Sequence, residues 1–305
     1  MFDTVGMFLS DNYLKESLIN ISKESFDKIT GERILTGTLE NLRIKRIGNR
    51  VSAIGSLPKF YFGDNIQSLT RKDTEAAIEK ASDLLHLPMK ESAIFRLDIG
   101  SNFILDLPLQ NYYTCLGELS RFKKSEIANK QTLLYSTSTK TLQFYDKVNE
   151  AKRSKQTIPE IFNQKNVLRY ELQLKKKIPG SLKLPEVKAK QLYDENFYIK
   201  GIDFWKNFYF LIQRVNKLKF NQESLTMVNA RTLLYQLAAM QVKTIGEGEL
   251  LSMIEANKNQ IKHRNQVSRM RELVKSLSNE PELTEPNEAI KELDSKVKRV
   301  SRYYR

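Results

Sequence analysis

Residues 93–99 read AIFRLDI, a stretch in which apolar and polar side chains alternate. Because successive side chains of a β-strand point to opposite faces of a sheet, we expect Phe95, Leu97 and Ile99 on one face and Arg96 and Asp98 on the other. The same alternation recurs in TLQFYDK at 141–147 and in VLRYELQL at 167–174. These stretches predict three strands, each with a buried apolar face and a polar face.

The polar faces of these strands carry residues suited to phosphoryl chemistry. If the strands are neighbours in one sheet, they bring together Asp98, Tyr145 and Glu171, with Arg96, Arg169 and Lys147 around them. Two carboxylates on a rigid sheet can hold a hard divalent cation, Mg²⁺ or Mn²⁺. A tyrosine hydroxyl becomes nucleophilic when nearby positive charge favours the phenolate, and Lys147 would supply that charge. The alternative is a solvated face with weak surface ion pairs.

The elements around these strands predict the fold class. Residues 35–59 alternate in the same way and contain Gly48-Asn49, which indicates a hairpin. Residues 70–88 begin with Thr70, have an acid three positions later and repeat apolar residues at helical spacing. A further helix is expected over 108–119, and strands over 131–147 and 166–177. Residues 1–200 therefore predict an α+β domain with a mainly antiparallel central sheet and helices on one face.

The pattern changes in the last third of the chain. Apolar residues there follow a 3.6-residue spacing, so residues 201–305 predict a helical C-terminal region. The stretch NEPELTEPNE at 279–288 is typical of a linker, and we expect a short basic tail after it, ending VKRVSRYYR.

The composition limits the classes of partner that the chain is expected to bind. The 305 residues include 50 Lys and Arg against 36 Asp and Glu, a formal net charge of +14, which favours a polyanionic partner. Cys115 is the single cysteine, so neither a disulfide framework nor a cysteine-based metal site is expected. Without a signal-like or membrane-spanning apolar run, a cytoplasmic protein is expected. The candidate partners are then nucleic acid, an anionic membrane surface or an acidic protein. Basic runs beside the strands that carry Asp98, Tyr145 and Glu171 favour DNA and make a membrane the least expected partner.

Four short tracts resemble a known family. They are IGSLPKFYFGDN at 54–65, FRLDIGSN at 95–102, FYDKVNE at 144–150 and VLRYEL at 167–172. Their order and spacing resemble the phage and plasmid replication initiators typified by the gene II/X proteins of filamentous phages, over roughly residues 35–200. The resemblance implies a metal-dependent enzyme that nicks and closes one strand at an origin. A tyrosine would form a 5′-phosphotyrosyl link, and the free 3′-hydroxyl would prime rolling-circle synthesis.

The same resemblance implies roles for individual residues. A Tyr-x-Lys-x-x-Glu pattern falls on Tyr145, Lys147 and Glu150, which makes Tyr145 the expected nucleophile. Asp98 and Glu171 are the implied metal ligands, and Glu150 is either a third ligand or the partner of Lys147. The chain has only His86 and His263, far apart, so it lacks the His-hydrophobic-His metal pair of many rolling-circle initiators. A helix cap or packing role is expected for His86.

Several alternatives remain open at this stage. Tyr135 competes with Tyr145 as nucleophile but lacks its basic and acidic companions. We expect a DNA-binding groove from the basic residues near the site, which are Arg96, Lys152, Arg153, Lys155, Arg169, Lys175, Lys176 and Lys177. Expected partners are origin duplex and single-stranded DNA, with a host helicase and polymerase. A non-catalytic DNA-binding replication or copy-control protein and a nuclease that uses water are the rival functions.

Overall fold

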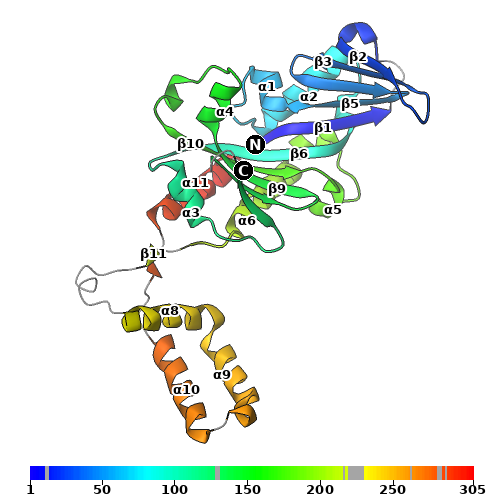
Figure 1. The fold of residues 1–305 in the computed structure, drawn as a ribbon. Helices are drawn as coiled ribbons and strands as arrows, with labels where there is room; N and C mark the ends of the chain where they lie inside the picture. The colour runs from blue at the N-terminus through cyan, green and yellow to red at the C-terminus, as the bar shows by residue number, and fades with distance from the viewer. Residues whose placement is uncertain are drawn as a thin grey trace. The chain divides into compact units, whose positions relative to one another are not determined.

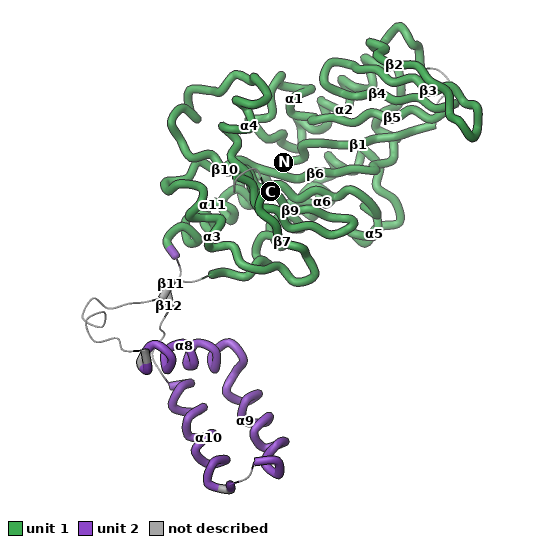
Figure 2. Tube along the Cα trace, in the orientation of Figure 1, with its two compact units in different colours: residues 1–215, 288–305 green, residues 216–287 purple. Residues whose placement is uncertain are grey.

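The computed structural model describes residues 1–10, 14–127, 131–215, 217–218, 230–261, 263–279, 284–285 and 287–305. The chain forms two compact units, one of residues 1–215 with 288–305 and one of residues 216–287 (Figure 2). The boundary expected after residue 200 falls inside a helix, α6 (Glu195–Phe210). The second unit is therefore an insertion between two parts of the first.

The first unit contains a ten-stranded sheet in which every pairing is antiparallel (Figure 1). The order across the sheet is β2-β3-β4-β5-β1-β6-β10-β9-β8-β7. The strands are β1 (Phe2–Ser10), β2 (Asn20–Phe26), β3 (Arg33–Leu39), β4 (Leu42–Ile47), β5 (Arg50–Ser56), β6 (Ala93–Leu105), β7 (Lys123–Ile127), β8 (Thr132–Ser136), β9 (Lys140–Asp146) and β10 (Asn166–Leu174). This architecture confirms the expected α+β class.

Local signals place the turns and caps. Ile47 pairs with Arg50, so Gly48 and Asn49 form the two-residue hairpin loop that their sequence predicts, with Gly48 at a φ of 54°. Helix α2 (Arg71–Leu85) begins at Thr70, which forms a reciprocal capping box with Asp73. The helix ends at His86 in the left-handed conformation, so His86 is a cap residue, as expected.

Helices cover the apolar face of the sheet and fix its core. One hydrophobic cluster combines the strands with α2, α6 and α11 (Glu288–Tyr303). Trp205 of α6 stacks on Phe103 and Tyr170, and the Tyr170 hydroxyl donates to the Trp205 carbonyl at 3.1 Å. The shorter helices are α1 (Leu57–Phe62), α3 (Leu109–Cys115), α4 (Lys147–Arg153) and α5 (Ile178–Leu182).

The expected basic tail is instead helix α11. Ala289, Ile290, Leu293 and Val297 of this helix are buried in the core of the first unit. They recur at helical spacing beneath the Lys and Arg residues of the same segment, so the apolar stripe packs while the charges stay outside.

The second unit is helical, as the sequence predicts. It consists of α8 (Ala230–Ile245), α9 (Glu247–Ala256) and α10 (Arg264–Ser278), with the two-residue strands β11 (Lys217–Leu218) and β12 (Thr284–Glu285). Its small core is formed by Ala239, Val242 and Leu277. Across the described parts of both units, no helix is long and apolar enough to cross a membrane.

Candidate active site

The register of the sheet makes neighbours of the three strands with polar faces. Strand β10 lies between β9 and β6, and Arg169 pairs with Tyr145 on one side and Asn102 on the other. Glu171 pairs with Gly100, and Gln173 pairs with Asp98. A Cβ atom on Gly100 would lie 2.8 Å from the Glu171 side chain, so glycine leaves the room that Glu171 occupies. The predicted convergence of Asp98, Tyr145 and Glu171 on one face follows from this register.

Tyr145 and Glu171 are in direct contact on the wall of a cavity. The Tyr145 hydroxyl donates to Glu171 Oε1 at 3.0 Å, and Gln173 donates to Glu171 Oε2 at 3.2 Å. Both residues line a cavity of about 590 Å³, together with Gln143, Asp146, Glu150 and Arg153. Burial raises the pKa of Tyr145 well above its ordinary value, and Arg169 opposes that rise. The phenol is therefore protonated in the free protein, with a carboxylate placed to accept its proton.

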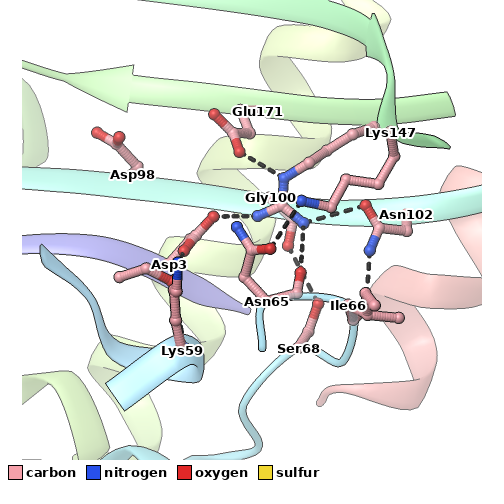
Figure 3. Close-up of polar contacts among 12 residues, drawn as sticks. Asp3, Lys59, Asn65, Ile66, Ser68, Asp98, Gly100, Asn102, Lys147 and Glu171 are labelled. Carbon is pink, nitrogen blue, oxygen red and sulfur yellow. Dashed lines mark hydrogen bonds and ion pairs between the residues drawn. The ribbon is translucent and has the colours of Figure 1, made fainter. Parts of the chain in front are cut away.

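Arg169 lies at the centre of a buried polar network. Its partners Asp3, Asn65, Asn102 and Glu171 are labelled in Figure 3. Its guanidinium donates to Glu171 and Asp3, to Asn102 Oδ1 at 3.0 Å and to the Asn65 carbonyl at 3.4 Å. The side chain is only 2% exposed. The sequence predicts contact between Arg169 and DNA, but the enclosed guanidinium has no surface to offer a phosphate.

The acid Asp3 in this network was not predicted from the sequence. It lies on β1, pairs with Arg169 and accepts from the Ser56 hydroxyl at 2.5 Å. Burial raises the pKa of Asp3, although Arg169 opposes the shift. Burial also disfavours the charge of Glu171, but the charge and hydrogen bond of Arg169 hold the pKa of Glu171 below its ordinary value. The apolar residues Val5 and Met7, two positions apart, are the signal that marks β1 as a strand.

Lys147 is not beside the Tyr145 hydroxyl. It is the first residue of α4, is 1% exposed, and donates from Nζ to Glu150 at 2.6 Å and to Asn65 Oδ1 at 2.7 Å. Burial lowers the pKa of Lys147, as does the charge of Arg169. Arg169 is thus the cation that opposes the rise in the pKa of Tyr145. The structure gives Glu150 the salt-bridge role that was one of its two expected roles.

Asp98 and Arg96 form a separate ion pair on β6. Arg96 Nη2 lies 2.7 Å from Asp98 Oδ2, with the Arg96 side chain 32% exposed and Asp98 buried. Burial raises the pKa of Asp98 to about 7, against the hydrogen bond and charge of Arg96. The nearby charges of Glu171 and Asp3 also raise the pKa of Asp98, so the three carboxylates interact electrostatically.

Tyr135 lies on the opposite face of the sheet from Tyr145. It pairs with Leu142, is fully buried, and donates to the carbonyls of Leu116 at 3.2 Å and Gly117 at 2.8 Å. Burial raises the pKa of Tyr135 above its ordinary value. A hydroxyl enclosed in the core cannot reach a phosphodiester, so the structure favours Tyr145 over Tyr135.

Phe95 also departs from the expected pattern. Gly6 pairs with Arg96 and Met7 with Ile94, so Phe95 is an extra residue in a β-bulge between β1 and β6. The bulge places Phe95 on the polar side of the sheet, 37% exposed, instead of in the core with Leu97 and Ile99.

The two basic runs lie at opposite ends of β10. Lys152, Arg153 and Lys155 follow β9 at the Tyr145 end, where Arg153 donates to Gln131 Oε1 at 2.5 Å on the cavity wall. Lys175, Lys176 and Lys177 follow Leu174, about 20 Å along the strand from Arg169, and so lie at the Asp98 end. All six are exposed.

The cavity beside Tyr145 offers oxygen donors, but Asp98 is not among its lining residues. Carboxylate and amide oxygens line the cavity, and Mg²⁺ commonly uses one or two carboxylates together with substrate phosphates. Within the described residues, no group of three or more Asp, Glu, His or Cys side chains is arranged to hold a metal. Each expected ligand is instead paired with a basic side chain: Asp98 with Arg96, Glu171 with Arg169 and Glu150 with Lys147. Arg96 is the most exposed of these partners and the easiest to displace.

Comparison with known proteins gives one family. The model of Phage_CRI, the N-terminal region of the phage gene II-type replication-associated protein, matches residues 22–195, more than half of the chain. No curated protein matches the sequence. The matched stretch contains Asp98, Tyr145 and Glu171, whereas Asp3 lies before it.

Proposed function

Because the chain belongs to the gene II-type replication-associated protein family, we propose that it is a replication initiator that nicks one strand at a phage or plasmid origin. The observation that carries the proposal is the Tyr145 hydroxyl, which donates to Glu171 at 3.0 Å on the wall of a cavity. A tyrosine nucleophile, an adjacent proton acceptor and access for a strand are the parts that transesterification needs.

In the proposed reaction, Tyr145 Oη attacks a backbone phosphorus. A new phosphorus–oxygen bond to tyrosine forms and the bond to the 3′-oxygen breaks. The phenol proton passes by way of Glu171 to solvent, so Glu171 ends the step as a carboxylate, and the leaving oxygen gains a proton from solvent. Arg169 holds Glu171 in place and compensates its charge. The phosphotyrosyl link conserves the energy of the phosphodiester, so attack by a 3′-hydroxyl can reverse the step and close the strand.

We assign Asp98 and Glu171 as the residues that would hold Mg²⁺ or Mn²⁺. When bound, such a cation polarises a phosphate oxygen and stabilises the charge of the transition state. In the cytoplasm, the released 3′-hydroxyl would be extended by a host polymerase, with a host helicase separating the strands.

The test is incubation of the protein with supercoiled plasmid carrying its origin, with Mn²⁺ or Mg²⁺. We expect nicked plasmid and a protein–DNA adduct that survives denaturation. Tyr145→Phe should abolish both, whereas Tyr135→Phe is the matched control and should retain both. An adduct that survives Tyr145→Phe but not Tyr135→Phe would reverse the assignment.

The rival functions give different results in the same assay. A nuclease that uses water would nick without an adduct, and a non-catalytic DNA-binding replication protein would retain plasmid without nicking. Asp98→Asn and Glu171→Gln should abolish nicking but keep DNA retention, and chelation of the metal should do the same. Full nicking in both variants would refute the carboxylate site.

A further inference from the structure

The polar face of the sheet continues from the candidate active site onto β1, β5 and β4. Arg43 pairs with Ile54, Ile54 with Gly6, and Gly6 with Arg96, so these residues form a row across the strands. In the adjacent row, Lys45 pairs with Ser52 and Ser52 with Phe8. Arg43 is three strands from Asp98's strand, about 14 Å away across the sheet.

This part of the face combines exposed cations with aromatic rings. We call it the basic-aromatic surface, and it consists of Phe8, Arg43, Lys45, Arg50 and Phe95. The two rings lie 6.4 Å apart, and the Arg50 guanidinium lies 4.2 Å over the Phe8 ring. A hollow of about 410 Å³ is lined by Thr36, Arg43, Lys45, Ser52, Ile54 and Phe95.

The cations of the basic-aromatic surface are exposed and form no ion pair within the part of the chain that the structure describes, unlike Arg33 on the neighbouring strand. Among the described residues, no carboxylate forms an ion pair with Arg43, Lys45 or Arg50. On the neighbouring strand β3, the exposed Arg33 is neutralised by Glu16 and Glu24. Cations without an ion pair to any described residue therefore lie at the hollow and its rim, where they suit a phosphate backbone. Asp27, whose pKa is lowered mainly by backbone hydrogen bonds, nevertheless lies near enough for the charge of Lys45 to lower that pKa further.

Two backbone features present Phe95 to this hollow. The β-bulge turns Phe95 out of the core, and Gly6 lets its ring lie against the β1 backbone, since a Cβ there would be 2.7 Å from the ring. An exposed aromatic ring beside unpaired cations is how proteins bind single-stranded nucleic acid, by stacking bases and neutralising phosphates. Paired bases within a duplex offer no free face for such stacking.

We propose that the basic-aromatic surface binds single-stranded DNA, with a base stacked on Phe95 and phosphates on Arg43 and Lys45. The proposal rests on the proposed function, because the strand it holds is the one that leads to or from the cleavage site. Arg43 and Asp98 lie on the same face of one sheet, so a bound DNA strand could run along that face from Arg43 to the candidate active site.

The experiment is fluorescence anisotropy of the full-length chain with labelled oligothymidylate in chelator, so that binding is measured without cleavage. Arg43→Ala/Lys45→Ala should weaken binding by at least about tenfold and reduce the salt slope by about 1.4, the value for two lost phosphate contacts. Phe95→Ala should weaken binding by about fivefold to hundredfold with an unchanged slope, because it removes a stacking platform but no charge.

Matched variants separate this effect from general electrostatics and from misfolding. Lys72→Ala/Lys90→Ala removes two exposed cations from α2 and the segment after it, and should leave binding within about twofold of wild type. Phe95→Tyr should restore affinity and Phe95→Leu should not, since both keep an apolar body but only tyrosine stacks.

The outcomes distinguish this inference from the proposed function. Wild-type affinity in both Arg43→Ala/Lys45→Ala and Phe95→Ala would overturn the inference, even if the protein nicks its origin. An equal loss of affinity for a matched duplex would also overturn it, because the surface would then be a duplex site. Loss confined to oligothymidylate in a protein that never forms an adduct would support the surface and refute the nicking function.

Discussion

The two halves of the polar sheet face use charge in opposite ways. On β6, β9 and β10, the charged groups are buried or half-buried and are paired with one another, with Arg169 between Asp3 and Glu171. On β4 and β5, Arg43, Lys45 and Arg50 are exposed and lack such partners in the described part of the chain. In the first half, Asn65 accepts hydrogen bonds from Lys147 of helix α4 and from Arg169, which helps enclose those charges. Equivalent alternating strands therefore carry a closed network of paired charges in one place and exposed cations without ion pairs, among the described residues, in another.

The largest expected effect separates the two Arg-x-acid pairs. Arg169→Met should lower the free energy of unfolding by about 3–5 kcal/mol, because it leaves the carboxylates of Asp3 and Glu171 buried without their partner. Arg96→Met should cost much less, because Arg96 is partly exposed and Asp98 can take up a proton instead. Denaturant titration measures both, and equal losses would contradict the buried network.

The next effect concerns pH. The pKa of Asp98 is about 7 in the folded protein against 3.8 in the unfolded chain, so between these values the folded state binds the extra proton. Stability contributed by protonated Asp98 is therefore lost as the pH rises from 5 to 7, at up to about 1.4 kcal/mol per pH unit. Asp98→Asn should flatten that slope in denaturant titrations with chelator present. Identical slopes in the variant and the wild type would contradict the shift.

A smaller effect compares the two tyrosines. Tyr135→Phe should cost about 1 kcal/mol of stability, because it removes the donor to the carbonyls of Leu116 and Gly117, and should leave nicking intact. Thermal unfolding and the plasmid assay check the two halves of this prediction. Loss of nicking in folded Tyr135→Phe would contradict the placement of Tyr135 in the core.

The smallest effect lies on the basic-aromatic surface. Arg43→Ala/Lys45→Ala should change the free energy of unfolding by no more than about 0.5 kcal/mol, because both side chains are exposed and neither is ion-paired within the described residues. A stability loss as large as that of Arg169→Met would show that the two halves of the face do not differ as described.

The sequence predicts the parts of the site that depend on local alternation. Tyr145, Glu171 and Asp98 lie on the expected face because β9, β10 and the part of β6 from Leu97 onward keep a regular two-residue period. Two departures arise where that period breaks: Phe95 is turned outward by a bulge, and Lys147 begins a helix one residue after β9 ends. No local sequence pattern predicts the bulge at Phe95 or the helix that begins at Lys147.

Long-range pairing accounts for the rest. Asp3 meets Arg169 only because β1 inserts between β5 and β6, far from β10 in sequence. The apolar stripe of α11 is visible in the sequence, but its packing onto the first unit depends on the chain returning after residues 216–287. Such partners become apparent only when the sheet order is known.

The most direct test of the central claim is to map the residue that becomes linked to DNA. The adduct formed with a single-stranded origin oligonucleotide would be digested with protease and nuclease and its modified peptide sequenced by mass spectrometry. We predict a single phosphotyrosyl modification on Tyr145. A modification on any other residue, or a cleaved oligonucleotide without an adduct, would contradict the account.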